Sequence, residues 1–228
     1  MTTTRKSDKL LPGAGFIDLS LYLVTDRRLA GDRPLTEVAR KAVAGGVTIV
    51  QLREKECSSR QYLELARSIK KILPPEVPLI INDRLDVALA AQADGVHLGQ
   101  DDLPAEVARK YLGPQAIVGL SVENLEQLEQ AINLPVDYLA LSPVFATPTK
   151  TDTGPAWGLE GLARARRMTA LPLVAIGGIN ESNAAEVIKA GADGLAVVSA
   201  VCAAPDPEQA ARRLRRLIDE TRRAMKQR

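Results

Sequence analysis

The sequence has few of the residues that support zinc, thiolate or disulfide chemistry. Its 228 residues include only two cysteines and one histidine. Cys57 and Cys202 lie far apart and show no CxxC spacing, which argues against a thiolate metal site and against a disulfide framework. We therefore interpret both as free thiols and expect a cytoplasmic protein.

An excess of charge and a long apolar run are also missing. The 30 basic and 28 acidic residues leave a net charge of +2, so no global attraction to nucleic acid or to an acidic membrane is expected. No apolar run is long enough to span a bilayer, and residues 1–12 lack the apolar core of a signal peptide. We expect small-molecule substrates as partners, with neither nucleic acid nor membrane, and a homo-oligomer stays open.

Strand-like and helix-like segments alternate along the chain. The eight short apolar runs that predict strands are Leu21–Thr25, Thr48–Leu52, Leu79–Asn82, Gly95–Leu98, Ile117–Leu120, Tyr138–Leu141, Leu173–Ile176 and Gly194–Ser199. The segments with helical spacing are Leu35–Ala44, Tyr62–Ile72, Leu85–Ala91, Val107–Leu112, Leu125–Ile132, Leu159–Arg167, Ala184–Ala190 and Ala210–Met225.

This alternation predicts an α/β fold, a single (β/α)₈ TIM barrel with its active site at the C-terminal ends of the strands. Strands without polar alternation are buried on both faces, which requires a parallel sheet covered by helices. Eight such units in 228 residues suit one barrel. An open, doubly wound sheet is the alternative. We expect residues 1–15 to be a flexible leader and residues 16–228 to form the catalytic barrel.

Cationic side chains follow the second predicted strand. Alternation places Gln51, Arg53 and Lys55 on one side of the chain and Leu52 on the other. An arginine fork and a lysine point charge suit an oxyanion with several acceptor oxygens, such as a phosphate or diphosphate. A solvated surface cluster is the alternative for this segment taken alone.

Two aspartates follow the third and fourth predicted strands. Asp83 and Asp102 can meet because neighbouring barrel strands lie only about 5 Å apart. Oxygen ligands in small number beside phosphate-binding cations favour Mg²⁺ over zinc. The alternative is that Asp101 or Asp102 is the N-cap of a helix that begins near Pro104.

The later strand ends predict a second anion site. Gly177 and Gly178 follow the seventh strand, and Ser199 ends the eighth, where barrels often bind a phosphate through backbone N–H groups. The hydroxyl-rich segment 146–154, which contains Lys150, is interpreted as a phosphate clamp or as a flexible polar loop. A cationic first site and a neutral second site suggest a diphosphate at the first and a monophosphate at the second.

These segments as a set resemble the thiamine-phosphate synthase family. The motifs are Gln51-Leu52-Arg53-Glu54-Lys55, Asn82-Asp83, His97-Leu98-Gly99-Gln100-Asp101-Asp102, Ser121, Thr147-Pro148-Thr149-Lys150, Gly177-Gly178-Ile179 and Val198-Ser199. They occur in the family's order, and the resemblance covers nearly the whole chain from Leu21 onward.

The resemblance implies condensation of a pyrimidine diphosphate with a thiazole phosphate, or its carboxylate form, through a dissociative pyrimidine-cation mechanism that yields thiamine phosphate and diphosphate. It implies that Gln51, Arg53, Lys55 and Asn82 hold the pyrimidine diphosphate, Asp83 and Asp102 the Mg²⁺, Ser121 the pyrimidine, Lys150 the diphosphate, and Thr147, Thr149, Gly178, Val198 and Ser199 the thiazole phosphate. Arg53, Lys55 and Lys150 would then be the catalytic cations, because negative charge grows on the leaving diphosphate.

Three other functions are compatible with parts of this pattern. A thiazole tautomerase of the same superfamily is disfavoured by Glu123, where those proteins look to carry a histidine, and by the presence of Lys150. A sugar-phosphate isomerase would need a paired acid and base, which the lone His97 does not supply. A non-catalytic thiamine-precursor binding protein would not need the metal carboxylates. His97 itself is interpreted as a hydrogen-bonded support of the site.

Overall fold

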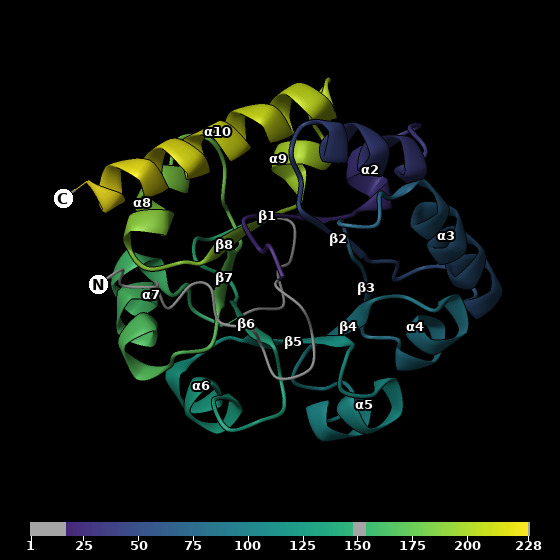
Figure 1. Cartoon of the computed structure of the whole chain (residues 1–228), viewed down its shortest axis with the longest axis horizontal. Helices are drawn as coiled ribbons and strands as arrows, with labels where there is room; N and C mark the ends of the chain where they lie inside the picture. Colours follow the sequence, from purple (N-terminus) through teal and green to yellow (C-terminus); the bar gives the residue numbers. More distant parts are fainter. Residues whose placement is uncertain (1–16, 148–153, 228) are drawn as a thin grey trace, which may run out of the picture.

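The strands form one closed, parallel barrel. The computed structural model describes residues 17–147 and 154–227, and its strands pair in chain order from β1 round to β8, which returns to β1 (Figure 1). The strands are β1 Leu21–Val24, β2 Ile49–Leu52, β3 Leu79–Asn82, β4 Gly95–Leu98, β5 Ile117–Val122, β6 Tyr138–Leu141, β7 Leu173–Ile176 and β8 Gly194–Val197. The predicted TIM barrel is confirmed, and the open-sheet alternative is wrong.

The helices form a ring outside the strands (Figure 1). In the described part of the chain they are α1 Arg27–Ala30, α2 Leu35–Ala44, α3 Ser59–Ile72, α4 Leu85–Ala91, α5 Ala105–Leu112, α6 Leu125–Ala131, α7 Gly158–Met168, α8 Ala184–Lys189, α9 Ser199–Cys202 and α10 Pro207–Lys226. The short helices α1 and α9 were not predicted. Strand β8 ends at Val197 because Ser199 already begins α9.

Local sequence explains where the longer helices begin. Helix α3 begins after a capping box, in which the Ser58 hydroxyl accepts from the Gln61 amide and the Gln61 side chain accepts from the Ser58 amide. Helix α10 has Pro207 at its first turn, after Asp206 caps two backbone N–H groups. It packs between α2 and α8 and so closes the helical ring (Figure 1).

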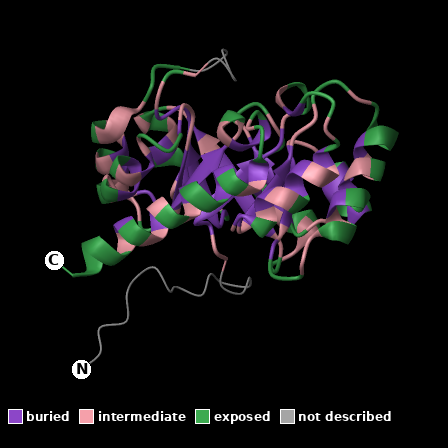
Figure 2. Cartoon of the chain, turned by 90° about the horizontal axis from the view of Figure 1, so that it is seen from above, coloured by how far each residue is buried: buried purple, intermediate pink, exposed green. Residues whose placement is uncertain are grey.

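Alternation along the strands produces two cores. Leu21 and Leu23 of β1 point outward into a large cluster between the strands and the helices. Tyr22 and Val24 of the same strand point inward, where a smaller cluster fills the barrel with residues such as Ile80 and Val174. Figure 2 shows the strands buried at the centre and the exposed residues on the outer faces of the helices.

The predicted leader, residues 1–15, lies outside the described residues. Among the residues that the structure does describe, no helix is both long and apolar enough to cross a membrane.

Candidate active site

A cavity of about 420 Å³ opens at the C-terminal ends of the strands. It is lined by most of the residues predicted from sequence, namely Gln51, Arg53, Lys55, Asn82, Asp83, Asp102, Ser121, Thr147, Gly178, Val198 and Ser199. Thr149 and Lys150, also predicted, lie outside the described residues. The structure thus brings eleven predicted residues, from seven strand ends, to one cavity.

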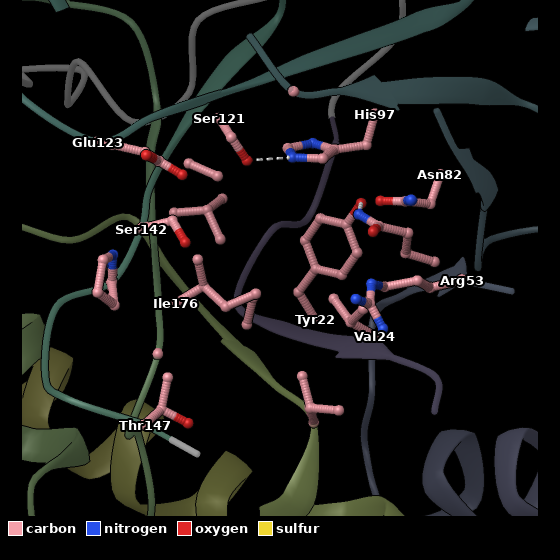
Figure 3. Close-up of a pocket in the computed structure, with 18 of the residues that line it drawn as sticks. Tyr22, Val24, Arg53, Asn82, His97, Ser121, Glu123, Ser142, Thr147 and Ile176 are labelled. Atoms are coloured by element: carbon pink, nitrogen blue, oxygen red, sulfur yellow. Dashed lines mark hydrogen bonds between the residues drawn. The ribbon is translucent and has the colours of Figure 1, made fainter. Parts of the chain in front are cut away.

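The inner wall of this cavity is polar on one half. The inward residues of β1 to β5 at the cavity floor are Tyr22, Gln51, Asn82, His97 and Ser121. These consecutive strands place hydroxyl, amide and imidazole groups side by side (Figure 3). Gln51 and His97 are only 4% and 7% exposed, so their polar atoms can serve one another or a ligand but hardly bulk water.

The opposite half of the wall is mostly apolar. Strands β6 to β8 contribute Ala140, Val174, Ile176 and Ala196 to the cavity, and Val198 follows directly. Alternation along the strands places these side chains at inward positions, and Ser142, which follows β6, adds one hydroxyl to this half. A flat heterocycle bound in this cavity would therefore contact polar side chains on one side and apolar side chains on the other.

Cations lie beyond the polar half, where β2 ends. The backbone N–H of Arg53 donates to the Thr25 hydroxyl at 3.1 Å, and its guanidinium pairs with Asp26 at 3.5 Å. Asp26 also caps α1, which fixes the orientation of its carboxylate. The Arg53 side chain is 21% exposed, whereas Lys55 is an exposed residue at the cavity mouth. One cation is thus preorganised and the other is free to adjust.

Two carboxylates lie close together beside these cations. Asp83 adopts a positive φ of 62° and donates its backbone N–H to the His97 carbonyl at 2.8 Å. Burial and the nearby Asp102 carboxyl raise the pKa of Asp83 to about 6, while Lys55 and Arg53 act to lower it. The Asp102 carboxylate accepts from the Gly99 amide at 2.6 Å. Helix α5 has Pro104 as its N-cap without a side-chain cap, so the N-cap alternative for Asp101 or Asp102 is wrong.

This carboxylate pair fits a hard divalent cation. Two oxygen donors crowded together in a partly buried place need a compensating positive charge. No group of three or more metal-binding side chains occurs in the described part of the chain. Two protein carboxylates suit Mg²⁺, which usually keeps several waters and takes further oxygens from substrate phosphates.

Glycines shape the cavity beyond its apolar half. Gly177 and Gly178 have φ values of 99° and 67°, which side chains rarely adopt. A Cβ atom on Gly178 would lie 2.7 Å from the Phe145 Cβ, because the segment after β6 packs on this turn. The turn therefore exposes backbone to the cavity at close range, next to Ser199.

Sequence reasoning missed the two tyrosines of the barrel interior. Tyr22 lines the cavity floor, and Tyr138 lies directly behind it, fully buried. Their hydroxyls are 2.8 Å apart, and the Tyr138 hydroxyl also lies 2.9 Å from Nδ1 of His97. The usable signal was positional, since an aromatic residue at an inward strand position of a barrel must fill its interior.

The chain is similar to known proteins along most of its length. A model of the family described as thiamine monophosphate synthase matches residues 21–201. The chain is 61% identical over 202 residues to a thiamine-phosphate synthase of Albidiferax ferrireducens, covering 88% of this chain and 92% of that protein. It is 56% identical over 207 residues to one of Azorhizobium caulinodans, covering 90% and 98%.

A solved structure supports the same similarity. The thiamine phosphate pyrophosphorylase of Pyrococcus furiosus superposes with a TM-score of 0.82 at 41% identity, covering 90% of this chain and 98% of that one. A 3-hexulose-6-phosphate synthase superposes with a TM-score of 0.63 at 20% identity, which shows a shared fold alone.

Proposed function

The chain belongs to the thiamine monophosphate synthase family, and from that premise we propose which of its side chains carry out the reaction. It is a transferase that forms thiamine phosphate. The reaction we assign joins 4-amino-2-methyl-5-(diphosphooxymethyl)pyrimidine to 4-methyl-5-(2-phosphooxyethyl)thiazole and releases diphosphate. The carboxylate form of the thiazole would release carbon dioxide as well. The thiazole tautomerase and binding-protein alternatives have no comparable support.

One observation carries the assignment of the two substrates. The polar half of the inner wall continues into Arg53 and Lys55, whereas the apolar half continues into the Gly177-Gly178 turn and Ser199. A polar heterocycle with a highly charged diphosphate suits the first half, and a less polar ring with a monophosphate suits the second. The two rings then meet across one cavity.

The pyrimidine diphosphate is assigned to the polar half. Gln51, Asn82 and Ser121 offer amide and hydroxyl groups to the ring and its substituents. Arg53 and Lys55, with Lys150 as a further proposed cation, bind the diphosphate oxygens. As the bond to the leaving group stretches, negative charge grows on those oxygens, and fixed cations stabilise it without reorganising.

The thiazole phosphate is assigned to the apolar half. Val198 and its apolar neighbours border the ring, and backbone groups at Gly178 and Ser199 receive the phosphate. Thr147 lines the same side of the cavity, and we propose that its hydroxyl and that of Thr149 bind this phosphate. Glycine at position 178 is needed because a side chain would collide with Phe145.

The bond changes need no protein nucleophile. The C–O bond between the pyrimidine methylene and the diphosphate breaks, and its electron pair leaves with the diphosphate. The 4-amino group of the ring stabilises the cation that remains, and the thiazole nitrogen attacks it from the apolar half. The protein's contribution is to hold both rings in line and to exclude water from the cation.

Asp83 and Asp102 are proposed to hold Mg²⁺. When bound, the ion neutralises charge on the leaving diphosphate. The crowding of the two carboxylates, which raises the pKa of Asp83, supports this proposal. Chelation with EDTA should abolish turnover and added Mg²⁺ restore it. Calorimetry should show Mg²⁺ binding in the presence of diphosphate that is lost in Asp102→Asn, and full activity in chelator would refute the metal site.

The decisive experiment mixes both substrates with Mg²⁺ and follows diphosphate and thiamine phosphate in the same sample. Stoichiometric appearance of both products is expected. If both substrates bind but neither product forms, the chain binds thiamine precursors without joining them, and the proposed reaction is wrong.

A further inference from the structure

A series of buried hydrogen bonds crosses the barrel interior between Gln51 and Ser121. Nε2 of Gln51 donates to the Tyr22 hydroxyl at 2.9 Å, and this hydroxyl lies 2.8 Å from the Tyr138 hydroxyl. Nδ1 of His97 lies 2.9 Å from the Tyr138 hydroxyl, and Nε2 of His97 lies 2.9 Å from Oγ of Ser121. We call these five side chains the tyrosine relay. Figure 3 shows the His97 ring beside Ser121, with Tyr22 across from it.

The barrel is built to accommodate this relay. The His97 and Tyr138 rings stack with centroids 5.5 Å apart, and both face Gly119 of β5. A Cβ atom on Gly119 would lie 2.1 Å from Cζ of Tyr138 and 2.6 Å from Nδ1 of His97. A residue with a side chain at this position would therefore break the contact between the tyrosine and the histidine.

Burial of the two tyrosines requires each of their hydroxyl hydrogens to be hydrogen-bonded. Tyr22 is 1% exposed and Tyr138 is 0% exposed. Desolvation raises the pKa of both phenols well above the ordinary value, so both hydroxyls keep their protons. Each phenol then has one hydrogen, and a buried hydrogen without an acceptor would cost about 1–3 kcal/mol. The O–H groups of both tyrosines must therefore point at a hydrogen-bond acceptor within the relay.

These constraints couple the bonds of the relay, and the orientation of the Gln51 amide then sets their direction. Because Gln51 donates to Tyr22, the Tyr22 hydrogen goes to its one other partner among the described residues, Tyr138. Tyr138 in turn donates to Nδ1 of His97, which leaves the ring hydrogen on Nε2. Nε2–H then donates to Ser121, and the Ser121 hydrogen is free to point into the cavity.

The Gln51 end of the relay presents a hydrogen-bond acceptor to the cavity, in contrast to the donor at Ser121. Oε1 of Gln51 has no hydrogen-bond partner within the described residues. It is nevertheless not fully buried, because the one buried side-chain atom without a partner in that part of the chain is Oε1 of Glu54. Since Gln51 lines the cavity, its amide carbonyl is accessible there as an acceptor. Rotation of the Gln51 amide would reverse every bond in the series and make Ser121 an acceptor towards the cavity.

We propose that His97, Tyr138 and Tyr22 are positioning residues that couple Gln51 to Ser121, so that the cavity presents an acceptor at one end and a donor at the other and thereby selects an aminopyrimidine. The proposal rests on the assignment of the pyrimidine to the polar half. An amino group donates to the Gln51 carbonyl while an unprotonated ring nitrogen accepts from Ser121. A 4-oxo analogue reverses both roles, so it matches the cavity only after the Gln51 amide has rotated and every bond of the relay has reversed with it.

The first test reads the histidine directly. The protein contains one histidine, so nitrogen NMR of a sample labelled in histidine reports on His97 alone. The expected result for the wild-type protein is a neutral ring with its hydrogen on Nε2. A ring with its hydrogen on Nδ1 would overturn the proposed direction, even in a protein that forms thiamine phosphate normally.

The second test measures discrimination by binding, because the amino group also takes part in the chemistry. Dissociation constants are measured by calorimetry for the aminopyrimidine diphosphate and its 4-oxo analogue. Tyr138 does not line the cavity. The Tyr138→Phe substitution should lower the preference for the amino compound by about tenfold, the value of one buried hydrogen bond. It should also allow both neutral tautomers of His97 to be populated.

A matched variant separates the relay from general packing. Tyr62 is also a buried tyrosine, and its hydroxyl bonds to the Leu52 and Asn82 carbonyls outside the relay. Tyr62→Phe should leave the His97 tautomer and the amino-to-oxo preference unchanged. An unchanged preference in Tyr138→Phe would overturn the proposal. Failure of the wild-type protein to form thiamine phosphate would instead refute the proposed function and leave the tautomer result standing.

Discussion

Carboxylates at the N-terminal end of the barrel are paired with hydrogen-bond donors and basic side chains, whereas two carboxylates at the C-terminal end lie against each other. At the N-terminal end, Asp94, Asp137 and Asp193 precede β4, β6 and β8, and each accepts from the first or second N–H of the preceding strand at 2.7–2.8 Å. Each also pairs with a basic side chain, Lys70, Arg109 or Arg166, at 3.1, 2.7 and 2.6 Å. Thr48 takes the same place before β2, where its hydroxyl accepts from Leu21 at 3.1 Å.

At the C-terminal end one pair of carboxylates is left incompletely balanced. Asp83 and Asp102 lie against each other, and their proximity together with burial raises the pKa of Asp83. The protein thus neutralises charge internally where only stability is required. It leaves charge unbalanced where a ligand is expected to complete the site, as functional sites often do at the expense of stability.

The largest effect is expected from Asp83→Asn. Activity should fall by about a thousandfold, because one of the two proposed metal ligands and its charge are lost next to the leaving group. The metal-free variant should nevertheless melt at a higher temperature than the wild-type protein, since the repulsion from Asp102 is removed. Steady-state kinetics and thermal melting in EDTA measure the two effects. A lower melting temperature would mean that Asp83 is a structural residue like those at the other end.

Asp137→Asn should have the opposite outcome. Its side chain is 6% exposed and serves both the Val118 amide and Arg109, which is itself 19% exposed. Breaking this buried pair should lower the free energy of unfolding by about 3 kcal/mol, measured by urea denaturation. The values of kcat and KM should not change, and a selective loss of kcat would contradict the division between the two ends.

The arginines sharpen the comparison at a smaller scale. Arg53→Lys should lower kcat/KM for the pyrimidine diphosphate by about thirtyfold, because a lysine cannot reproduce the planar fork. Its matched control is Arg109→Lys, in which the lost bonds run to the Pro135 and Ala116 carbonyls and to Asp137. That variant should lose stability and keep its kinetics. Equal kinetic effects in the two variants would refute the assignment of Arg53 to the substrate.

The same division explains what the sequence could predict. For six of the eight predicted strands, both the first and the last residue lie within one position of the observed bounds. The prediction succeeds because a strand buried on both faces is a continuous apolar run. The residues after those strands identified the cavity, since the C-terminal ends of parallel strands converge. Helices α1 and α9, of four residues each, left no periodic signal.

Contacts across the barrel were beyond sequence reasoning. Tyr22 and Tyr138 are 116 positions apart, and nothing in either segment alone shows that their hydroxyls meet. Asp102 was open to interpretation as a helix cap because a proline follows two residues later, a pattern that local sequence shares with true caps. The structure shows instead that its carboxylate accepts from Gly99. His97 was correctly expected to be hydrogen-bonded, but its partners depend on the register of β4, β5 and β6.

The smallest change in stability is expected at the junction of β1 and β2, where Thr48 takes the place of the aspartate. Thr48→Val keeps the shape of the side chain but removes the acceptor for the Leu21 amide and the donor to the Leu21 carbonyl, in a residue that is only partly buried. The free energy of unfolding should fall by about 1–2 kcal/mol, the value of two neutral hydrogen bonds, while Thr48→Ser should retain most of the stability. A loss as large as that in Asp137→Asn would show that the backbone bond, and not the ion pair, carries the stability of these junctions. Urea denaturation of the three variants side by side therefore separates the two contributions at the N-terminal end.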